Sequence, residues 1–228
     1  MANTIEALRR TVLFGGLEDR ELEALSRRAV ELRLARGELL FLAGEPAKGL
    51  YVIVEGAVRA FRESLEGREQ IIHIERAGAT IAEVPVFDDQ PTPSSVAAEE
   101  ETTLLFIGKA DVRRLCLEHP QISLAALKVL AARLRKCSEL VALLSLHDVG
   151  QRIACLLLKE AQAHGTRDDG KIRFTLDLTK EQIATRVGSV REVVSRAFGR
   201  LQSEGLLEVE GREVTILDEH RFAGFCER

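Results

Sequence analysis

The stretch LTKEQIATRVGSVREVVSRAFGRLQSEGLL, residues 178–207, decides the fold of the C-terminal part of this chain. Two short amphipathic helical patterns meet in it at Gly188. Thr179, with Gln182 three residues later, forms a capping-box pattern that places the start of the first helix. One face of the second pattern is polar and carries Arg191, Glu192, Ser195 and Arg196. Its other face is an apolar stripe that we expect to be buried, made by Val190, Val194, Ala197, Phe198 and Leu201. Two such helices joined at a glycine predict a helix-turn-helix motif, whose second helix enters the major groove of DNA.

The residue types on this polar face suit the edges of DNA bases. An arginine donates two hydrogen bonds to guanine, a glutamate accepts one from cytosine, and a serine contacts a base or a phosphate. We therefore expect base reading by Arg191, Glu192, Ser195 and Arg196. Phosphate contacts, which give affinity and register, are expected from Thr179, Lys180, Arg186, Ser189 and Arg200. The alternative interpretation is that the arginines form an ordinary solvated helix face.

The composition is that of a soluble globular protein. With 228 residues, 46% hydrophobic and 30% charged, the chain is long enough for two modest domains. No apolar run reaches the ~18–20 residues of a membrane span, and the start MANTIEALRRTVLFGG lacks the apolar core of a signal peptide. We expect a cytoplasmic protein with no membrane partner. The net charge of −4 does not argue against DNA, because residues 178–203 carry five basic and only two acidic side chains.

The cysteines give no sign of a cluster. The chain has four of them, far apart in the sequence: Cys116, Cys137, Cys155 and Cys226. No CxxC pair and no Cys/His cluster has the spacing of zinc ligands, so we expect no metal site. Because thiols are kept reduced in the cytosol, we expect these cysteines to be free thiols.

The N-terminal half predicts helices followed by strands. Residues 1–35 suggest two short helices, the second with an apolar stripe of Leu22, Leu25 and Ala29. From Gly37 to about Ile107, short apolar runs such as ELLFLAG, LYVIVEG and QIIHIE alternate with turns. This spacing predicts short antiparallel strands in a barrel or sandwich. Residues 88–93 (DDQPTP) are expected to be a loop, and residues 109–119 a short helix stopped by Pro120.

The longest helical pattern covers about residues 121–146. Its apolar positions recur at spacings of 3, 4, 3, 4 and 3, and they form a heptad seam of Leu127, Leu130, Leu134, Cys137, Val141 and Leu144. A 3.5-residue repeat favours two long helices packed side by side, so we expect a homodimer about a twofold axis. The alternative is a helix packed on its own domain.

The C-terminal segments flank the helix-turn-helix motif. Residues 149–163 predict an amphipathic helix, residues 164–170 a polar turn and residues 171–176 a strand. Residues 207–217 (LEVEGREVTIL) predict a hairpin with Gly211 in its turn, which is typical of a wing beside a helix-turn-helix.

These features together resemble the Crp/Fnr superfamily of bacterial transcription regulators over nearly the whole chain. GELLFLAGEPAKGLYVIVEGAVRAF is similar to the family's N-terminal β-roll, and VGSVREVVSRAFGRLQSEGLL to its most specific signature. The resemblance implies an α+β fold with an antiparallel β-roll like the cyclic-nucleotide-binding jelly roll, a long central dimerisation helix and a C-terminal winged helix-turn-helix. It also implies three parts, a sensor domain at residues 1–119, a dimerisation helix at 120–147 and a DNA-binding domain at 148–228.

The resemblance assigns the base-reading residues individually. Glu192 and Arg196 match the family's glutamate and arginine that read a shared C·G pair. Ser195 matches the fumarate/nitrate reduction branch, whereas Arg191 matches the cyclic-AMP receptor branch. This mixture predicts palindromic double-stranded DNA whose half-sites contain the G common to TGTGA and TTGAT.

The resemblance also marks an effector pocket. GATIAEVPVFDDQPTPSSVAA resembles the family's phosphate-binding cassette, with Glu83 in the place of the ribose-binding glutamate and Ala82 where a glycine is usual. The cassette's phosphate-binding arginine falls at Pro93 or Ser94, and no Arg or Lys occurs between Ala77 and Lys109. A buried cyclic phosphate would lack a cation, so we expect an effector other than cyclic AMP. The candidate pocket residues are Glu83, Ser94, Ser95, Cys137 and Ser138. Glu83 is alternatively a structural carboxylate at a strand end.

Other signals remain open. Family members with an iron–sulfur cluster use cysteines near the N-terminus, and the first cysteine here is Cys116, so we expect no such cluster. Haem is possible as a cofactor, with His73 as the candidate ligand, although a strand histidine is more often structural. Cys137 either packs in the seam or forms a disulfide between subunits as a redox switch.

The sequence thus predicts a homodimeric, sequence-specific DNA-binding transcription regulator. Allosteric control would come from a signal at the β-roll or the long helix, and RNA polymerase is a further partner implied by the resemblance. The alternatives are a constitutively DNA-competent regulator and a haem- or redox-responsive gas sensor. No paired carboxylates, Ser/His/Asp set or phosphate-binding glycine loop is evident, so we do not expect an enzyme. A further alternative is a cyclic-nucleotide-gated or kinase-regulatory binding module. Such a module would need the roll but not the recognition helix, so the presence of residues 188–201 argues against it.

Overall fold

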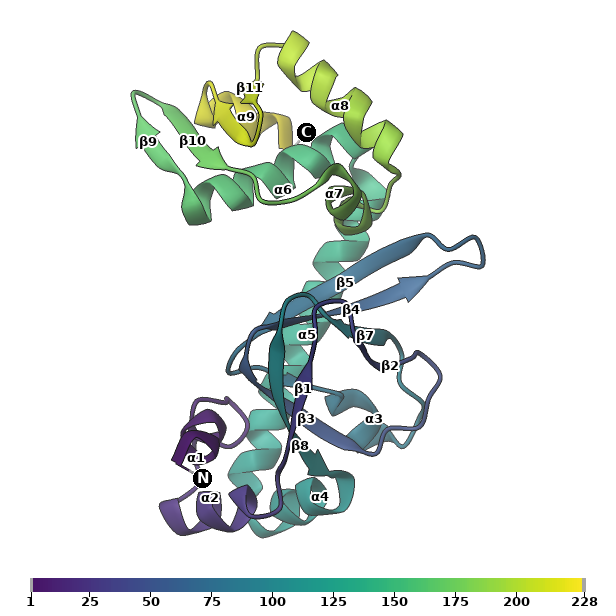
Figure 1. Cartoon of the computed structure of the whole chain (residues 1–228), viewed down its shortest axis with the longest axis vertical. Helices are drawn as coiled ribbons and strands as arrows, with labels where there is room; N and C mark the ends of the chain where they lie inside the picture. The colour runs from purple at the N-terminus through teal and green to yellow at the C-terminus, as the bar shows by residue number, and fades with distance from the viewer. Residues whose placement is uncertain (1, 227–228) are drawn as a thin grey trace. The chain divides into compact units, whose positions relative to one another are not determined.

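The structure, a computed structural model, describes residues 2–226 of the 228. Two compact units share the chain (Figure 1). The first contains the residues up to Arg62 and Ile72–Cys137, and the second contains Glu63–Ile71 and the residues from Ser138 onward. Each unit has its own hydrophobic core, and each is described below by itself.

The first unit begins with the two predicted helices. They are α1 (Ala2–Arg9) and α2 (Asp19–Ser26). A capping box between Glu18 and Glu21 fixes the start of α2. Leu22 and Leu25 of α2 are buried as predicted, whereas Ala29, which the sequence pattern placed on the same helical stripe, lies beyond the end of α2.

The predicted strands form a roll of two four-stranded sheets. Their orders are β1-β8-β3-β6 and β2-β7-β4-β5, and β8 pairs antiparallel with both β1 and β3. The strands are β1 (Val30–Leu34), β2 (Leu39–Phe41), β3 (Gly49–Glu55), β4 (Ala57–Glu63), β5 (Glu69–Arg76), β6 (Thr80–Ile81), β7 (Ser95–Ala98) and β8 (Thr102–Gly108). The strand region therefore begins at Val30, earlier than the predicted start at Gly37. Residues of both sheets share one core that includes Ile53, Val58 and Leu104, so the sandwich prediction is confirmed.

Among its described residues, the first unit contains three more helices. One lies between strands β6 and β7, and two follow β8, the last of which continues beyond Cys137 into the second unit. A short helix α3 (Glu83–Asp88) was not predicted, and the expected loop follows it. Helix α4 (Lys109–Glu118) ends before Pro120 as predicted, but Pro120 also begins helix α5 (Pro120–Leu146). Proline is favourable at a first helical position, where its missing N–H would have no partner within the helix.

The second unit has helices around a small sheet. Helix α6 (Val149–His164) starts with a capping box between Asp148 and Gln151. The sheet has the order β11-β12-β10-β9, and the unit ends with helix α9 (Glu219–Cys226). The strands are β9 (Thr166–Asp168), β10 (Lys171–Thr175), β11 (Leu207–Glu210) and β12 (Glu213–Ile216).

Two sequence predictions in this region meet different outcomes. Gly211, with a φ of 62°, lies in the turn between β11 and β12, so the predicted wing hairpin is confirmed. The prediction of a polar turn at residues 164–170 is wrong for residues 166–168, because they form strand β9 and pair with β10. The turn itself is shorter and is made by Asp169 and Gly170, both with positive φ, a pair of residue types suited to a tight hairpin.

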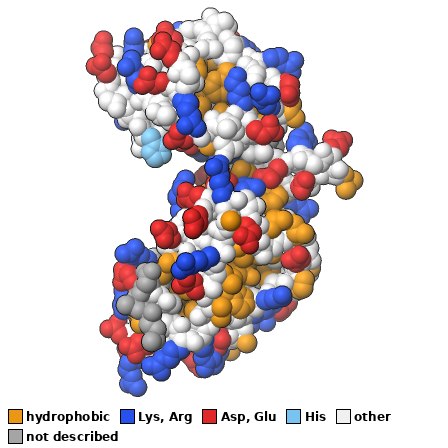
Figure 2. Space-filling model, in the orientation of Figure 1, with side chains coloured by type: hydrophobic (Ala, Val, Ile, Leu, Met, Phe, Trp, Pro, Cys, Tyr) orange, Lys and Arg blue, Asp and Glu red, His pale blue; other side chains and the backbone are white. Residues whose placement is uncertain are grey.

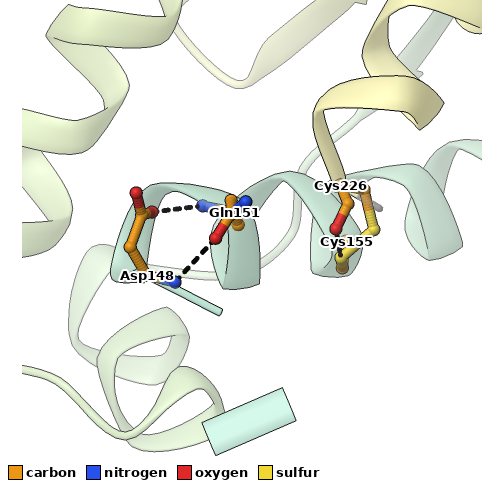
Figure 3. The surroundings of a disulfide bond; sticks show 4 residues. All are labelled: Asp148, Gln151, Cys155 and Cys226. Carbon is orange, nitrogen blue, oxygen red and sulfur yellow. Dashed lines mark hydrogen bonds between the residues drawn. A yellow bond between two sulfur atoms is a disulfide. The ribbon is translucent and has the colours of Figure 1, made fainter. Parts of the chain in front are cut away.

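A disulfide joins Cys155 of α6 to Cys226 of α9 (Figure 3). The expectation of free thiols is therefore wrong for this pair, whereas Cys116 and Cys137 are free. The reason is tertiary, because the packing of α9 on α6 brings two Cα atoms 71 residues apart in sequence to 5.1 Å, within the range that a disulfide spans.

No helix within residues 2–226 is long and apolar enough to cross a membrane.

Candidate nucleic-acid interface and effector pocket

The first helix of the predicted motif is α7 (Lys180–Val187), and its start is confirmed. The Thr179 hydroxyl accepts from the Gln182 backbone N–H at 3.2 Å, and the Gln182 side chain accepts from the Thr179 N–H at 2.9 Å. Gly188 caps the C-terminal end with a φ of 66°. Because that conformation costs glycine no steric penalty, the chain turns sharply there into the next helix.

The second helix, α8 (Arg191–Ser203), packs its apolar side into the core of the second unit. Val194, Phe198 and Leu201 are buried as predicted. Val190, predicted to belong to the same stripe, is instead the N-cap residue and is 43% exposed. The buried side fixes which way the polar side of the helix faces.

The polar side of α8 is open to solvent. Arg191, Glu192 and Arg196 are exposed, and Ser195 is half-buried. All four side chains stem from the first two turns of the helix. In a helix-turn-helix motif the residues that contact base edges come from this N-terminal part. The helix therefore presents donors and acceptors of the required types.

The predicted phosphate-contacting residues differ in their surroundings. Lys180 places its ammonium 5.9 Å from the centre of the Phe198 ring, and Arg186 donates to the Gln182 carbonyl at 3.3 Å. Arg200 pairs with Glu204 at 2.7 Å, a hydrogen bond that raises the pKa of the arginine. Thr179 and Ser189 flank α7 at its two ends. Arg200 must therefore break or share its ion pair with Glu204 before it can bind a phosphate.

Basic and acidic side chains are interspersed over the visible face of each unit (Figure 2). The view shows no large area of one sign. Binding to DNA would therefore depend on the local set of cations around α7 and α8, because exposed charges farther away than about 10 Å are screened.

A pocket in the first unit contains part of the predicted effector site. Its cavity volume is about 60 Å³. Glu83 and Ser94 line it together with Phe41, His73, Ile81, Ala82, Val84, Pro85, Thr92, Pro93, Val96 and Arg133. The other predicted residues do not line it in this chain: Ser95 is buried and its hydroxyl accepts from the Ala43 N–H at 3.0 Å, whereas Cys137 and Ser138 are exposed on α5. A drug-sized ligand commonly occupies about 300 Å³ or more, so this cavity would have to widen for a nucleotide.

The backbone at the entrance to α3 adopts an unusual conformation. Ala82, at the position where the family resemblance implies a glycine, has a φ of 71°. A residue with a side chain in the left-handed region costs on the order of 1 kcal/mol, so the surrounding structure must hold Ala82 in place. The carboxylate of Glu83, the next residue, is 5% exposed and accepts from the Thr80 hydroxyl.

The residue that sequence reasoning missed is Arg133. The heptad pattern leaves it off the seam, and its side chain is only 14% exposed. Nη1 lies 2.9 Å from Glu75 Oε1, and Nη2 lies 3.3 Å from Glu83 Oε1 and 2.7 Å from the Thr80 carbonyl. Lys136 also reaches Glu75 Oε1, at 3.0 Å. The pocket thus contains a cation from the long helix, and two carboxylates already hold it.

The candidate haem ligand His73 belongs to the same network. Both of its ring nitrogens lie near Arg133 Nη1, at 2.8 and 3.1 Å. Burial, and then the charge of Arg133, lower the pKa of His73 to about 4. The ring is therefore neutral at neutral pH, and a nitrogen of the ring accepts from the arginine. An iron ion would have to compete with Arg133 for that nitrogen.

The cations nearest to the cassette in the sequence bind helix α3 and do not line the pocket. Lys109 donates to the Pro85 carbonyl at 3.0 Å, and Arg113 to the Val86 carbonyl at 2.9 Å. Both also pair with Asp89, at 2.6 and 2.8 Å, and the hydrogen bonds from Arg113 and then Lys109 lower the pKa of Asp89 to about 2. These contacts fix the C-terminal end of α3 to α4.

Both units match known families. Residues 31–119 match the cyclic nucleotide-binding domain, and residues 151–225 match the Crp-like helix-turn-helix domain. The chain is 35% identical over 218 residues to the CRP-like cAMP-activated global transcriptional regulator of Mycobacterium tuberculosis, covering 96% of this chain and 97% of that one. It is 31% identical to the cyclic AMP receptor protein of Thermus thermophilus, over 92% of this chain and 96% of the relative.

A solved structure has the same fold. The crystal structure of a Crp/Fnr family regulator from Eubacterium rectale superposes with a TM-score of 0.78 at 21% identity, covering 96% of this chain and all of that one. A β-roll with a cyclic-nucleotide-binding-like topology joined to a winged helix-turn-helix defines a class of DNA-binding transcription regulators. This chain belongs to the Crp/Fnr family, which confirms the sequence prediction and the expectation of a protein that is not an enzyme.

Replacing Arg133 by alanine should destabilise the first unit by about 3 kcal/mol, because Glu83 then stays buried without its cation. Tyr51 is the chain's single tyrosine, tryptophan is absent and Tyr51 belongs to β3, so its fluorescence during urea unfolding reports this unit. Arg135→Ala, which removes an exposed arginine two positions along the same helix, is the control and should shift the midpoint little. Equal effects of the two changes would contradict the role of the buried pairs.

Proposed function

We propose that this Crp-like regulator acts as a homodimer that reads a palindromic DNA sequence and responds to a signal other than cyclic AMP. The signal would act on the β-roll or on α5, and RNA polymerase would be a further partner. The compartment would be the cytoplasm. The observation that carries the proposal is the exposed polar face of α8, with Arg191, Glu192 and Arg196 open to solvent above a buried apolar side.

The base-reading assignment follows from the chemistry of that face. Arg196 would donate to guanine, and Glu192 would accept from the cytosine paired with it. Arg191 and Ser195 would contact neighbouring positions of the same half-site. A twofold dimer places two such helices about 34 Å apart, one turn of DNA. The half-sites would therefore share the G of TGTGA and TTGAT and face each other with their centres one helical turn apart.

Arg196→Ala should weaken binding to such a palindrome by roughly 10- to 100-fold, since a bidentate contact discriminates by about 1–3 kcal/mol. Fluorescence anisotropy with the palindrome and with a scrambled duplex of equal length measures the loss of preference. The control is Arg20→Ala, which removes one exposed arginine from α2 in the other unit. A variant at position 196 that keeps the wild-type preference would refute the assignment.

The dimer proposal rests on the exposed leucines of α5. Leu127, Leu134 and Val141 of the seam are 61%, 72% and 64% exposed, so their own chain does not cover them. By contrast, Ile122 and Ala126 of the same helix are buried in the first unit. Exposed leucines repeating at heptad spacing fit a second copy of the same helix, which offers the same stripe in return.

Leu134→Asp should convert the dimer into monomers, because a charge in the centre of the seam would face its own copy. Light scattering at micromolar concentration should give twice the 25.2 kDa of one chain for the wild type and a single chain mass for the variant. Leu117→Asp is the control, as Leu117 of α4 is 84% exposed but lies outside the seam. A wild-type protein that is monomeric at every concentration would exclude the dimer.

The names of the two relatives include cyclic AMP, but the effector of this chain depends on the residues of its own pocket. A cyclic phosphate in this pocket would find one cation, Arg133, already paired with Glu75 and Glu83. It would have to displace those carboxylates or lie beside them, which opposes binding. His73, the haem candidate, accepts from the same arginine. These contacts favour an effector other than cyclic AMP or haem, and they are also compatible with a regulator that needs no effector.

Cyclic AMP at 100 µM should therefore change the affinity of the protein for the palindrome less than twofold, and isothermal titration should detect no saturable heat. After addition of haem and removal of the unbound haem, the protein should show no Soret band. A tenfold gain in affinity with cyclic AMP would overturn this part of the proposal and leave the DNA-reading part intact. Full affinity in the ligand-free protein, unchanged by cell extract, would support the constitutive alternative.

A further inference from the structure

We infer that the Cys155–Cys226 pair is a reversible redox site that controls the docking of α9 on the DNA-reading unit. The two cysteines come from different helices, α6 and α9, and the close-up of the bond shows Cys226 lying against α6 one turn beyond Gln151 of its capping box (Figure 3). Nothing in the proposed reading of DNA uses this bond. The inference rests on the proposed function for its compartment and for its DNA readout.

Helix α9 connects the disulfide to the recognition helix. Arg221 of α9 donates to the carbonyl of Glu204 at 3.0 Å, and Glu204 is the C-cap residue of α8. A cation at a helix C-terminus satisfies free carbonyls and interacts favourably with the helix dipole. Phe222, fully buried, packs α9 into the core that Val194 and Leu201 of α8 share. The position of α9 therefore bears directly on the C-terminal end of α8.

The disulfide decides how firmly α9 is held. An isolated helix of eight residues is marginal in water, so α9 depends on tertiary contacts for its order. Among the described residues, those contacts include the Phe222 side chain, the Arg221 hydrogen bond and an ion pair between Arg167 and Glu219 at 3.1 Å. The crosslink closes a loop of 71 residues that contains both helices of the motif and the wing, and a loop of that length restricts the unfolded state strongly.

Two observations favour a switch over a permanent crosslink. Thiols in the proposed compartment are kept reduced, and a disulfide that forms there is usually transient or redox-sensing. Cys155 and Cys226 are both half-buried rather than sealed in the core, so a small oxidant or a reducing dithiol has access to the sulfurs.

The chemistry needs one oxidant, a hydroperoxide. One thiolate attacks the O–O bond of hydrogen peroxide and becomes a sulfenic acid, and hydroxide leaves. The second thiolate then attacks the sulfenic sulfur, the S–S bond forms, and the oxygen departs as water after taking up a proton. Two thiols and one peroxide thus give one disulfide and two waters. A reducing dithiol reverses the step by two successive thiol–disulfide exchanges and is itself oxidised.

The test compares the full chain after treatment with a phosphine reductant and after treatment with one equivalent of hydrogen peroxide. Alkylation and peptide mass spectrometry should find Cys155 and Cys226 modified after reduction and joined after oxidation. Tyr51 fluorescence does not report the unfolding of the second unit, so calorimetry is used for it. The melting temperature of that unit should fall by about 10 °C on reduction. Hydrogen exchange of residues 219–226 should speed up at least tenfold in the reduced protein.

Cys226→Ser should behave as the reduced wild type under both treatments, and Cys116→Ser, which changes a free cysteine of α4, should respond like the wild type. Three results would overturn the inference: both thiols alkylated after peroxide, exchange in α9 unaffected by reduction, or a reductant effect that persists in Cys226→Ser.

The affinity for a duplex with two facing TGTGA half-sites separates this inference from the proposed function. This affinity should fall about tenfold on reduction if roughly a tenth of the reduced molecules keep α9 docked, because the apparent affinity scales with the fraction of molecules that can bind. An oxidised protein that forms the bond but binds no palindrome would refute the proposed function and leave the redox site standing. Equal affinity of the two forms, with the bond and the change in hydrogen exchange both present, would refute the control of DNA reading.

Discussion

The ion pairs of Arg133 are the constraint on which the pocket of the β-roll depends. Glu75 and Glu83 are 13% and 5% exposed, and burying a carboxylate is costly unless a cation or several hydrogen-bond donors accompany it. The cation comes from the long helix and not from the cassette, where no Arg or Lys occurs between Ala77 and Lys109. One side chain therefore links the helix that carries the seam to the wall of the pocket. Any molecule that enters must leave these charges compensated, so an entering anion competes with two carboxylates for the same guanidinium.

The same contacts explain how a signal in the roll could reach α5. Arg133 lies directly before Leu134, an exposed seam residue, so a change in its pairing acts at the centre of the seam. A ligand shifts such an equilibrium only by its difference in affinity for the two arrangements of the helix. Competition for Arg133 would supply that difference, whereas a ligand that left the three charges undisturbed would not. His73, kept neutral by burial and by Arg133, adds no further charge to the balance.

The sequence predicts the elements whose signals are local. The capping box of Thr179 and Gln182, the turn at Gly188 and the hairpin at Gly211 depend on residues within a few positions of one another, and each is found. The strands between Gly37 and Ile107 were predicted from apolar runs and turns, and the roll was predicted from the family resemblance. Such patterns do not fix where a helix begins. The apolar repeat includes Val190, which lies one residue before α8 and is exposed.

The sites depend more on tertiary packing, and there prediction was partial. Two of the residues predicted for an effector site, Glu83 and Ser94, line the pocket, but Arg133 was missed because a charged residue on the flank of a helix normally faces water. The Cys155–Cys226 bond was missed because nothing in a spacing of 71 residues indicates that two helices will meet. Strand β9 was missed because Thr166–Asp168 carries exposed polar side chains, and pairing with β10 alone makes it a strand.

The recognition helix shows what the local charge count leaves out. Arg200 and Arg196 contribute equally to a count over residues 178–203, yet Arg200 is paired with Glu204 at 2.7 Å. Within the described part of the chain, Arg191 and Arg196 have no ion-pair partner, so they can meet DNA without first breaking an internal contact. An exposed pair such as Arg200–Glu204 contributes little because solvent screens it, whereas a bidentate base contact discriminates between bases by about 1–3 kcal/mol. In the proposed complex, the pairing would slightly reduce the affinity gained from phosphate contacts and would leave the discrimination between bases to the N-terminal turns of α8, where the unpaired arginines lie.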